Sequence, residues 1–234
     1  TISSCSFAGT VELSGRSENE DDLCVGGIAG WCDPSSKITL CKNSGSIVFS
    51  SLGTQDSKAY VGGIAGFTYG RVTDCEFAGE IKNSSAAADL SIGGIVSEVS
   101  AESTVQGNSF LGNIILTGTA KNIRIGGLYG LISSGNHIFD NDTDKSLAMG
   151  SIEIESYLSD AATEIYAGGM IGKAGKDVAL DIKGYEIQTN FSMNETAAIT
   201  SRLLATGGAL GGCGLEEEKV ASVKISDVKN SGTT

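Results

Sequence analysis

The sequence predicts an all-β protein, a β-solenoid wound as a right-handed parallel β-helix of about six to seven coils with three short strands per coil. Three observations predict this fold. A paired glycine recurs along the chain, a second motif with alternating apolar residues lies between the pairs, and helical periodicity is absent. Residues 1–234 then form a single repeat solenoid with a period of about 36 residues, truncated in mid-repeat at both ends.

The paired glycine is clearest in "YVGGIAGF" at 60–67 and "CVGGIAGW" at 24–31. The flanking residues are small or medium-sized and apolar in all copies, except for one threonine. Glycine leaves room where two walls of a narrow coil approach each other, and it permits backbone angles that are closed to other residues. Successive pairs are 31 to 42 residues apart and begin at Gly26, Gly62, Gly93, Gly126, Gly168 and Gly207.

The second motif reads "ISSCSFAGTV" (2–11), "ITLCKNSGSI" (38–47), "VTDCEFAGEI" (72–81) and "VQGNSFLGNI" (105–114). Its apolar residues share one parity, as Cys75, Phe77, Gly79 and Ile81 do, and a period of two indicates a strand with one buried face. Weaker copies follow, with an insertion after "IFDN" (138–141). The aligned column then contains Cys5, Cys41, Cys75, Asn108, Asn141, Asp181 and Val228.

Each repeat therefore provides three strand segments, "IxxC", "CxFxGxI" and "VGGIAG", separated by loops of variable length. One coil of this size cannot bury its apolar face alone, whereas stacked coils can. Equivalent residues of neighbouring coils would lie about 4.8 Å apart in a parallel ladder. Leucine-rich, ankyrin-type and βαβ repeats are disfavoured because the repeats lack a segment of helical length.

The cysteine column allows two interpretations. Cys5, Cys41 and Cys75 can form a buried stack of thiols that Asn108 and Asn141 continue, with amides bonding along the stack. Alternatively, a disulfide can join adjacent coils, since stacked Cα atoms fall within the permitted range. Asp181 fits an inward position poorly unless it reaches solvent at a corner.

Charge and hydropathy exclude several classes of partner. The net charge of −12 disfavours nucleic acid, because acidic surfaces repel phosphate backbones. A membrane span in this segment is not expected, because no run of about 18 apolar residues occurs. We expect no cofactor and no catalytic residues: the glycine pairs lack a phosphate-binding lysine, and the only histidine, His137, has no nucleophile motif near it.

One candidate metal site lies in the insertion. The stretch "DNDTD" places Asp140, Asp142 and Asp144 at alternate positions, which could present three carboxylates to Ca²⁺. It is not an EF-hand, because Lys145 stands where that loop requires glycine. The alternative is a solvated acidic loop.

The residues "YVGGIAGFTYGRVTDCEFAGEI" (60–81) resemble GLUG-motif repeats, which occur in bacterial surface and secreted proteins, including adhesins. The resemblance covers nearly the whole chain, although "AGGMIGKAGKDVALDIKGYEI" (167–187) departs from the pattern. It implies a solenoid in an extracellular or cell-surface setting, and it carries over no catalytic residues. Chlamydial-type outer-membrane passengers share only "GGAL" at 207–210.

These observations favour a non-enzymatic extracellular β-solenoid module that acts as an adhesin stalk or as a surface-display and binding scaffold. Its partner would be a protein or glycan surface ligand, recognised by the loops at 139–149 and 190–204 because rigid scaffolds carry function on their loops. The alternative is a structural subunit that self-associates end to end into an extracellular filament. A third is a carbohydrate-active β-helix enzyme.

Overall fold

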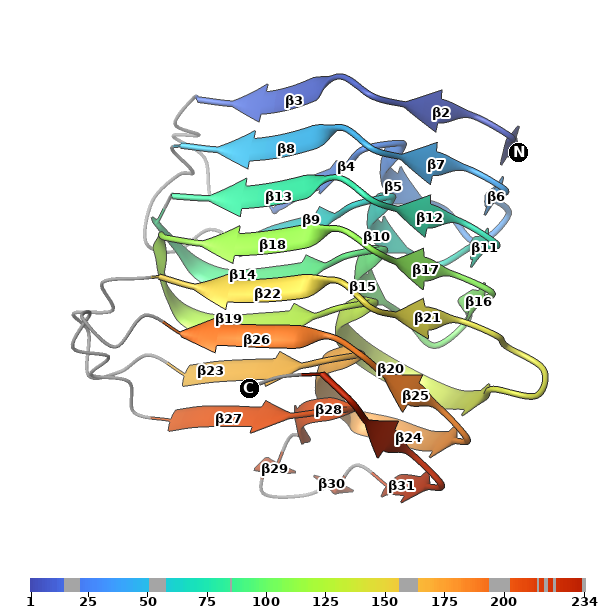
Figure 1. The fold of residues 1–234 in the computed structure, drawn as a ribbon. Helices are drawn as coiled ribbons and strands as arrows, with labels where there is room; N and C mark the ends of the chain where they lie inside the picture. The colour runs from blue at the N-terminus through green and yellow to red at the C-terminus, as the bar shows by residue number, and fades with distance from the viewer. Residues whose placement is uncertain are drawn as a thin grey trace.

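The computed structural model describes residues 1–14, 22–50, 58–84, 86–155, 164–193, 203–213, 215–216, 219–220 and 222–232. These residues contain strands and turns and no helix, which confirms the all-β prediction. In Figure 1 the chain runs from right to left along the near wall and from left to right along the far wall. It descends by one coil per turn, so the winding is a right-handed parallel β-helix.

Five parallel sheets run along the helix. Sheet A contains β1 (Ile2–Ser3), β6 (Lys37–Thr39), β11 (Arg71–Thr73) and β16 (Thr104–Gln106). Sheet B contains β2 (Ser6–Phe7), β7 (Lys42–Asn43), β12 (Glu76–Phe77), β17 (Ser109–Phe110) and β21 (Leu147–Ala148). Sheet C contains β3 (Thr10–Leu13), β8 (Ser46–Phe49), β13 (Glu80–Asn83), β18 (Asn113–Leu116), β22 (Ser151–Ile154) and β26 (Asn190–Met193).

Sheets D and E meet at the glycine pairs. Sheet D contains β4 (Leu23–Gly26), β9 (Lys58–Gly62), β14 (Ala86–Gly93), β19 (Thr119–Gly126), β23 (Glu164–Gly168) and β27 (Leu203–Gly207). Sheet E contains β5 (Ala29–Cys32), β10 (Ala65–Thr68), β15 (Val96–Val99), β20 (Tyr129–Asp140), β24 (Ile171–Lys183), β28 (Leu210–Cys213) and β31 (Ser222–Ser226). Two smaller pairs are β25 (Glu186–Ile187) with β32 (Lys229–Asn230), and β29 (Leu215–Glu216) with β30 (Lys219–Val220).

The prediction of three strands per coil is corrected to five in the first coils, and to four where β20 and β24 each replace two strands. The coil from β6 to β10 shows why: the "CxFxGxI" segment bends at Gly45, and the "VGGIAG" segment bends at Gly63 and Ile64. Each of these segments therefore divides into two strands, which belong to different sheets. Alternation of apolar residues continues across such a bend, so the sequence pattern does not reveal it.

The predicted stacking of the glycine motif is confirmed in all six copies. Gly26, Gly62, Gly93, Gly126, Gly168 and Gly207 occupy one column of sheet D. The residues after each pair stack as well, since the Ile28 N–H donates to the Ile64 carbonyl and the Ile64 N–H to the Ile95 carbonyl, at 3.0 and 2.9 Å. Like residues therefore lie over like residues, as the solenoid requires.

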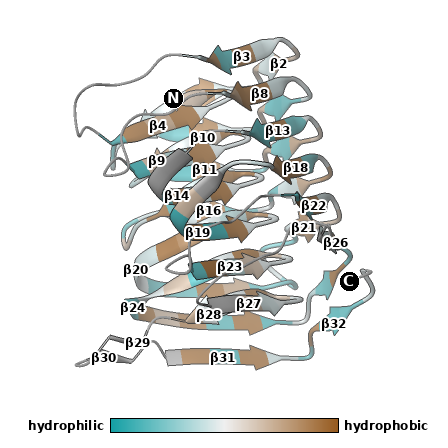
Figure 2. Cartoon of the chain, turned by 90° about the vertical axis from the view of Figure 1, so that its left-hand side faces the viewer, coloured by the Kyte–Doolittle hydropathy of each residue, from teal (hydrophilic) through white to brown (hydrophobic). Residues whose placement is uncertain are grey.

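Gly63 and Gly94, the second glycines of two pairs, face the aromatic rings of sheet B across the coil. Figure 2 shows the wall of sheet C on one side and that of sheet D on the other. A Cβ atom on Gly94 would lie 2.2 Å from Cδ2 of Phe110 and 2.1 Å from the Gly127 carbonyl oxygen. Phe110 itself stacks on Phe77, with ring centroids 6.4 Å apart. Glycine is thus needed for space at this position, and the aromatic stack fills the space that it leaves.

A left-handed residue precedes each strand of sheet B and each strand of the β25–β32 pair. Such residues immediately precede the cysteine column, and a turn in this conformation redirects the chain by a sharp angle. Glycine tolerates these angles, whereas other residues adopt them at a cost. The residues are Ser4, Leu40, Asp74, Gly107, Lys145, Gly184 and Asp227, with φ between 55° and 74°.

Leu40→Gly is therefore expected to stabilise the protein. Leu40 has φ 55° and is 58% exposed, so the substitution relieves backbone strain and removes little packing. We expect the free energy of unfolding to rise by about 0.5–1 kcal/mol in urea titrations. Leu111→Gly is the matched control, because Leu111 is 42% exposed without a positive φ and should lose stability. Equal losses in both variants would contradict the corner geometry.

The predicted column is wrong at two positions. Asn141 and Asp181 do not follow Asn108; Ser146 and Tyr185 take these places, and Val228 keeps its predicted place. The reason is that β20 and β24 run on through the region where earlier coils turn, with a register irregularity after Ile132. The left-handed corner consequently moves to residues 145 and 184. Asp181 pairs in register with Ile138, and both residues occupy outward positions of their strands.

Candidate functional site

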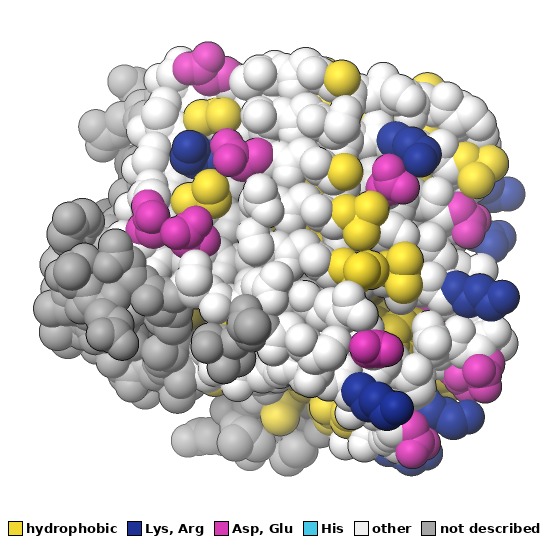
Figure 3. Space-filling model, viewed as in Figure 1, with side chains coloured by type: hydrophobic (Ala, Val, Ile, Leu, Met, Phe, Trp, Pro, Cys, Tyr) yellow, Lys and Arg dark blue, Asp and Glu magenta, His cyan; other side chains and the backbone are white. Residues whose placement is uncertain are grey.

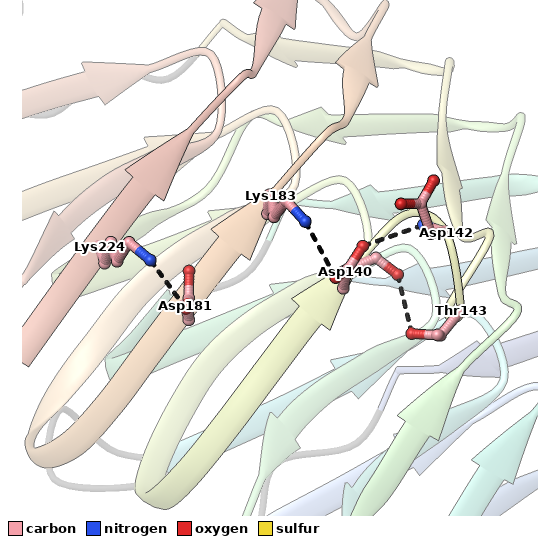
Figure 4. A network of polar contacts seen from close by, with 6 residues as sticks. All are labelled: Asp140, Asp142, Thr143, Asp181, Lys183 and Lys224. Atoms are coloured by element: carbon pink, nitrogen blue, oxygen red, sulfur yellow. Dashed lines mark hydrogen bonds and ion pairs between the residues drawn. The ribbon is translucent and has the colours of Figure 1, made fainter.

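The structure does not bring the three carboxylates of the insertion together. The chain turns at this point, and the Asp144 N–H donates to the Asp140 carbonyl at 2.7 Å. Asp140 accepts from the Asp142 N–H at 3.1 Å, while the Asp142 carboxylate points away from it (Figure 4). Asp144 is buried and faces inward. Across the described ranges, no group of three His, Cys, Asp or Glu side chains could hold a metal ion. A turn, and not an extended strand, thus separates the predicted calcium ligands.

The outward charges near this turn form ion pairs between coils. Asp140 lies 3.5 Å from the Lys183 ammonium, and Asp181 lies 3.5 Å from that of Lys224 (Figure 4). Each pair links neighbouring strands, β20 with β24 and β24 with β31. All four side chains are partly exposed, so solvent screening limits their contribution to stability. Asp140, in the predicted recognition loop at 139–149, therefore belongs to a row of ion pairs between neighbouring coils.

Asp144 is the centre of a buried polar network. Its Oδ1 accepts from the Gly107 N–H at 2.7 Å and from the Ser146 hydroxyl at 2.6 Å, and its Oδ2 accepts from the Tyr185 hydroxyl. Burial raises the pKa of Asp144, although these three donors counter the shift. Two members of the network, Ser146 and Tyr185, occupy the column positions that cysteines occupy in earlier coils. The network therefore provides hydrogen-bond partners for the polar groups that are buried there.

The cysteine column is a stack of free thiols. Cys5, Cys41 and Cys75 follow one another through backbone hydrogen bonds, and the Cys75 N–H donates to Oδ1 of Asn108 at 3.0 Å. All six cysteines are free, including Cys32 and Cys213, which share one column of sheet E but lie five coils apart. Burial raises the pKa of Cys75 to about 12. The thiol is therefore protonated at neutral pH and a weak nucleophile.

An unexpected surface arises where sheets D and E converge. The outward side chains of β9 and β10 meet across the glycine bend, and the Tyr60 and Phe67 rings contact edge to face at 5.7 Å. Phe67 stacks on Trp31 of the preceding coil, with centroids 4.5 Å apart and planes 10° from parallel. Tyr69 lies against both, with centroids 4.9 Å from Phe67 and 5.6 Å from Trp31. We call these four residues the aromatic cluster.

In the coil after the aromatic cluster, polar residues occupy the outward positions of sheets D and E. Glu98 pairs in register with Phe67 from the next coil and is only 8% exposed. Burial raises the pKa of Glu98, although the nearby Ser133 hydroxyl and the Arg124 guanidinium counter the shift. Arg124 also lies 3.6 Å from Asp89. The outward side chains where sheets D and E meet are thus half buried, because those of one sheet cover those of the other.

Glu98→Gln is expected to flatten the dependence of stability on pH. Because the pKa of Glu98 is raised in the folded state, the folded chain binds this proton more tightly than the unfolded chain. Stability therefore falls as pH rises from about 4.5 through the raised pKa, by about 1.4 kcal/mol for every tenfold difference in proton affinity between the two states. Urea titrations from pH 4 to 8 should show this fall in the wild type and a smaller one in the variant. Identical profiles would contradict the assignment.

Sequence reasoning missed the aromatic cluster, although the signal was present. Tyr60 and Phe67 are the two ends of "YVGGIAGF", and Trp31 ends "CVGGIAGW". Two residues seven positions apart, one on each strand of a strand–bend–strand unit, converge on its outer side. This spacing could have predicted that Tyr60 and Phe67 lie together. Of the two predicted recognition loops, residues 194–202 of the segment 190–204 lie outside the described residues.

A second exposed feature is a small apolar patch. Leu111, Leu147 and Met149 are each 42–44% exposed. Figure 3 shows hydrophobic side chains along the bends that join β17 to β18 and β21 to β22. Leu111 and Met149 belong to neighbouring coils, since the Met149 N–H donates to the Phe110 carbonyl. Charged side chains of both signs lie on the same face (Figure 3).

No protein-family model matches the chain, and comparisons with curated proteins and with solved structures likewise give no match. In the part of the chain that the structure describes, there is also no helix long and apolar enough to cross a membrane.

Proposed function

We propose that the chain is a non-enzymatic module of an extracellular or cell-surface protein, in which the β-solenoid holds a surface that binds a protein or glycan ligand. The observation that carries this proposal is the aromatic cluster. It is presented on the outer face of a scaffold whose coils are fixed in register. The resemblance to GLUG-motif repeats supports the extracellular setting and the solenoid's role in display.

The placement of the perturbed titratable groups supports a binding role over catalysis. Asp144 is surrounded by interior donors, and Glu98 is buried, with 8% of its surface exposed. His137 is buried, its Nε2 lies 2.9 Å from the Ser134 carbonyl oxygen, and burial lowers its pKa. Asp144 and His137 are hydrogen-bonded within the fold and Glu98 is buried in it, which is the arrangement of structural and not of reacting groups.

The test is a binding assay on immobilised extracellular glycoproteins and polysaccharides, with product analysis and light scattering on the same samples. We expect saturable binding to at least one surface, no new reducing ends and a mass that does not depend on concentration. Release of reducing ends would show a carbohydrate-active enzyme instead. Growth of mass with concentration would show a subunit that assembles end to end, and failure to bind any surface would contradict the proposal.

A further inference from the structure

The ladder of sheet A is interrupted after β16. In earlier coils the backbone N–H of the left-handed corner residue donates to a carbonyl of the next coil, as that of Asp74 does to Gln106 at 3.0 Å. The equivalent N–H of Gly107 donates instead to the Asp144 carboxylate at 2.7 Å. Across the described ranges no strand of the following coil pairs with β16, and Figure 1 shows the end of β20 well below it. A side chain thus replaces the missing backbone acceptor.

The end of β20 consequently has an unpaired edge. After its register irregularity this strand pairs with β24 alone. The Asn141 N–H donates to the Lys183 carbonyl at 3.0 Å. Because the bonding groups alternate along a parallel ladder, Asn136 and Ile138 direct their N–H and C=O groups away from β24. Within the described part of the chain, these four groups meet no hydrogen-bond partner. We call residues 136–140 the open edge.

The open edge is exposed, and the preceding coil bounds it at both ends. Ile138 at its centre is 76% exposed, the highest value among the large hydrophobic residues that the structure describes. At one end, a Cβ atom on Gly135 would lie 2.5 Å from Cα of Ala101. At the other, the Asp144 carboxylate accepts from the Gly107 N–H. A second solenoid therefore cannot reach these backbone groups, whereas a single extended chain can.

We propose that the open edge accepts an extended peptide of a partner protein as an added β-strand; this inference rests on the binding role proposed above and names its partner class. Unpaired backbone groups of an edge strand recruit the backbone of another chain, and the side chains then give specificity. A β-branched residue of the peptide would pack on Ile138.

The charges around the open edge favour a basic peptide. Glu102 is exposed and follows Ala101 at one end of the edge. Asp142 is exposed at the other end, where its N–H donates to the Asp140 carboxylate. Lysine or arginine at both ends of the peptide would complement these carboxylates, and the net charge of −12 would attract such a peptide from solution.

The open edge is not an end of the solenoid. The coil of β16 precedes it, and β24 and β31 follow it in the same wall. The contrast is with β24, which is of similar length but is paired on both sides, with β20 and with β31. The unpaired backbone groups therefore belong to one position, where the chain runs past the corner of earlier coils and turns only at Lys145.

The experiment titrates the 234-residue chain with a blocked heptapeptide of sequence KVTVTVK in a calorimeter. We expect saturable binding that weakens with added salt. The same peptide with every interior amide N-methylated cannot donate to a strand, and it should bind at least tenfold more weakly. Hydrogen exchange should show slower exchange of the Asn136 and Ile138 amides on binding. The Phe139 amide, which already faces β24, should not change.

A substitution on the open edge tests the same contact from the side of the chain. Ile138→Pro removes an N–H that points away from β24, so it should spare the ladder with β24 and weaken peptide binding at least tenfold. Ile138→Thr is the matched control: it keeps the backbone donor, loses part of the apolar contact and should lose less affinity.

Each outcome decides the inference. Binding that protects the Ile138 amide and is lost on N-methylation of the peptide supports it, even where Ile138→Pro does not fold. No binding, equal binding of the N-methylated peptide, or protection elsewhere overturns it. A dimer in light scattering that Ile138→Pro abolishes would assign the edge to a second copy and overturn it too. If the chain binds an immobilised surface but no peptide, this inference fails and the display function stands; if it binds neither, both fail.

Discussion

Gly94→Ala should destabilise the protein by about 3 kcal/mol or more. The added methyl group would lie 2.1 Å from the Gly127 carbonyl oxygen and 2.2 Å from a ring carbon of Phe110. The first contact is with backbone of the next coil, and the second is with a fully buried ring, so neither can move cheaply. The measurement is the free energy of unfolding from urea titration, and we expect the midpoint to fall sharply.

Gly9→Ala is the matched control for this prediction. The nearest atoms to a Cβ at Gly9 belong to the partly exposed ring of Phe7, at 3.2 and 3.3 Å, and this side chain can shift. We expect a change within about 0.5 kcal/mol. If Gly94→Ala were as harmless as Gly9→Ala, the walls of the coil would not approach each other as closely as described.

Asp144→Ala should be the second most damaging substitution, with a loss of about 3 kcal/mol or more. It would leave the Gly107 N–H and the hydroxyls of Ser146 and Tyr185 without their common acceptor in the interior. Each buried donor that loses its partner costs about 1–3 kcal/mol. Thermal and urea unfolding of the variant, followed by circular dichroism, would measure the loss.

Asp142→Ala separates this effect from a general change in the loop. Asp142 is exposed and lies two residues before Asp144 in the same turn. Its replacement should change the free energy of unfolding by no more than about 0.5 kcal/mol. Tyr185→Phe removes one donor of the network and should fall between the two. Equal effects of Asp142→Ala and Asp144→Ala would refute the buried network.

The register between coils could be predicted because the glycine pairs have no room for a side chain. At Gly62 and Gly93 a side chain would collide with backbone, so the glycine pair survives in every coil and marks the alignment. The corner before sheet B is specified more weakly. Leu40 and Lys145 adopt left-handed angles that Gly107 and Gly184 adopt freely, so residue type does not identify the corner in each coil. The longer strands β20 and β24 then displaced it beyond the predicted position.

The candidate site could be predicted only in part, because outward residues do not all meet solvent. Alternation assigns Tyr60, Phe67 and Glu98 to the outer face, and they do lie there. It does not show that sheets D and E fold toward each other at the glycine bend, which brings these side chains together. Conversely, alternation placed Asp140, Asp142 and Asp144 on one side, but a turn directs them to different partners.

The central claim is that equivalent residues stack at a constant rise along one axis. The most direct test measures distances between paired spin labels in the outward column of sheet B, in a chain whose Cys5, Cys24 and Cys213 are replaced by serine. Labels at Ser6 paired with Ser109, Leu147 or Glu186 span three, four and five coils. At a rise of about 4.8 Å per coil, the backbone separations should be about 14, 19 and 24 Å. Distances that do not increase by one constant step from pair to pair would contradict the solenoid.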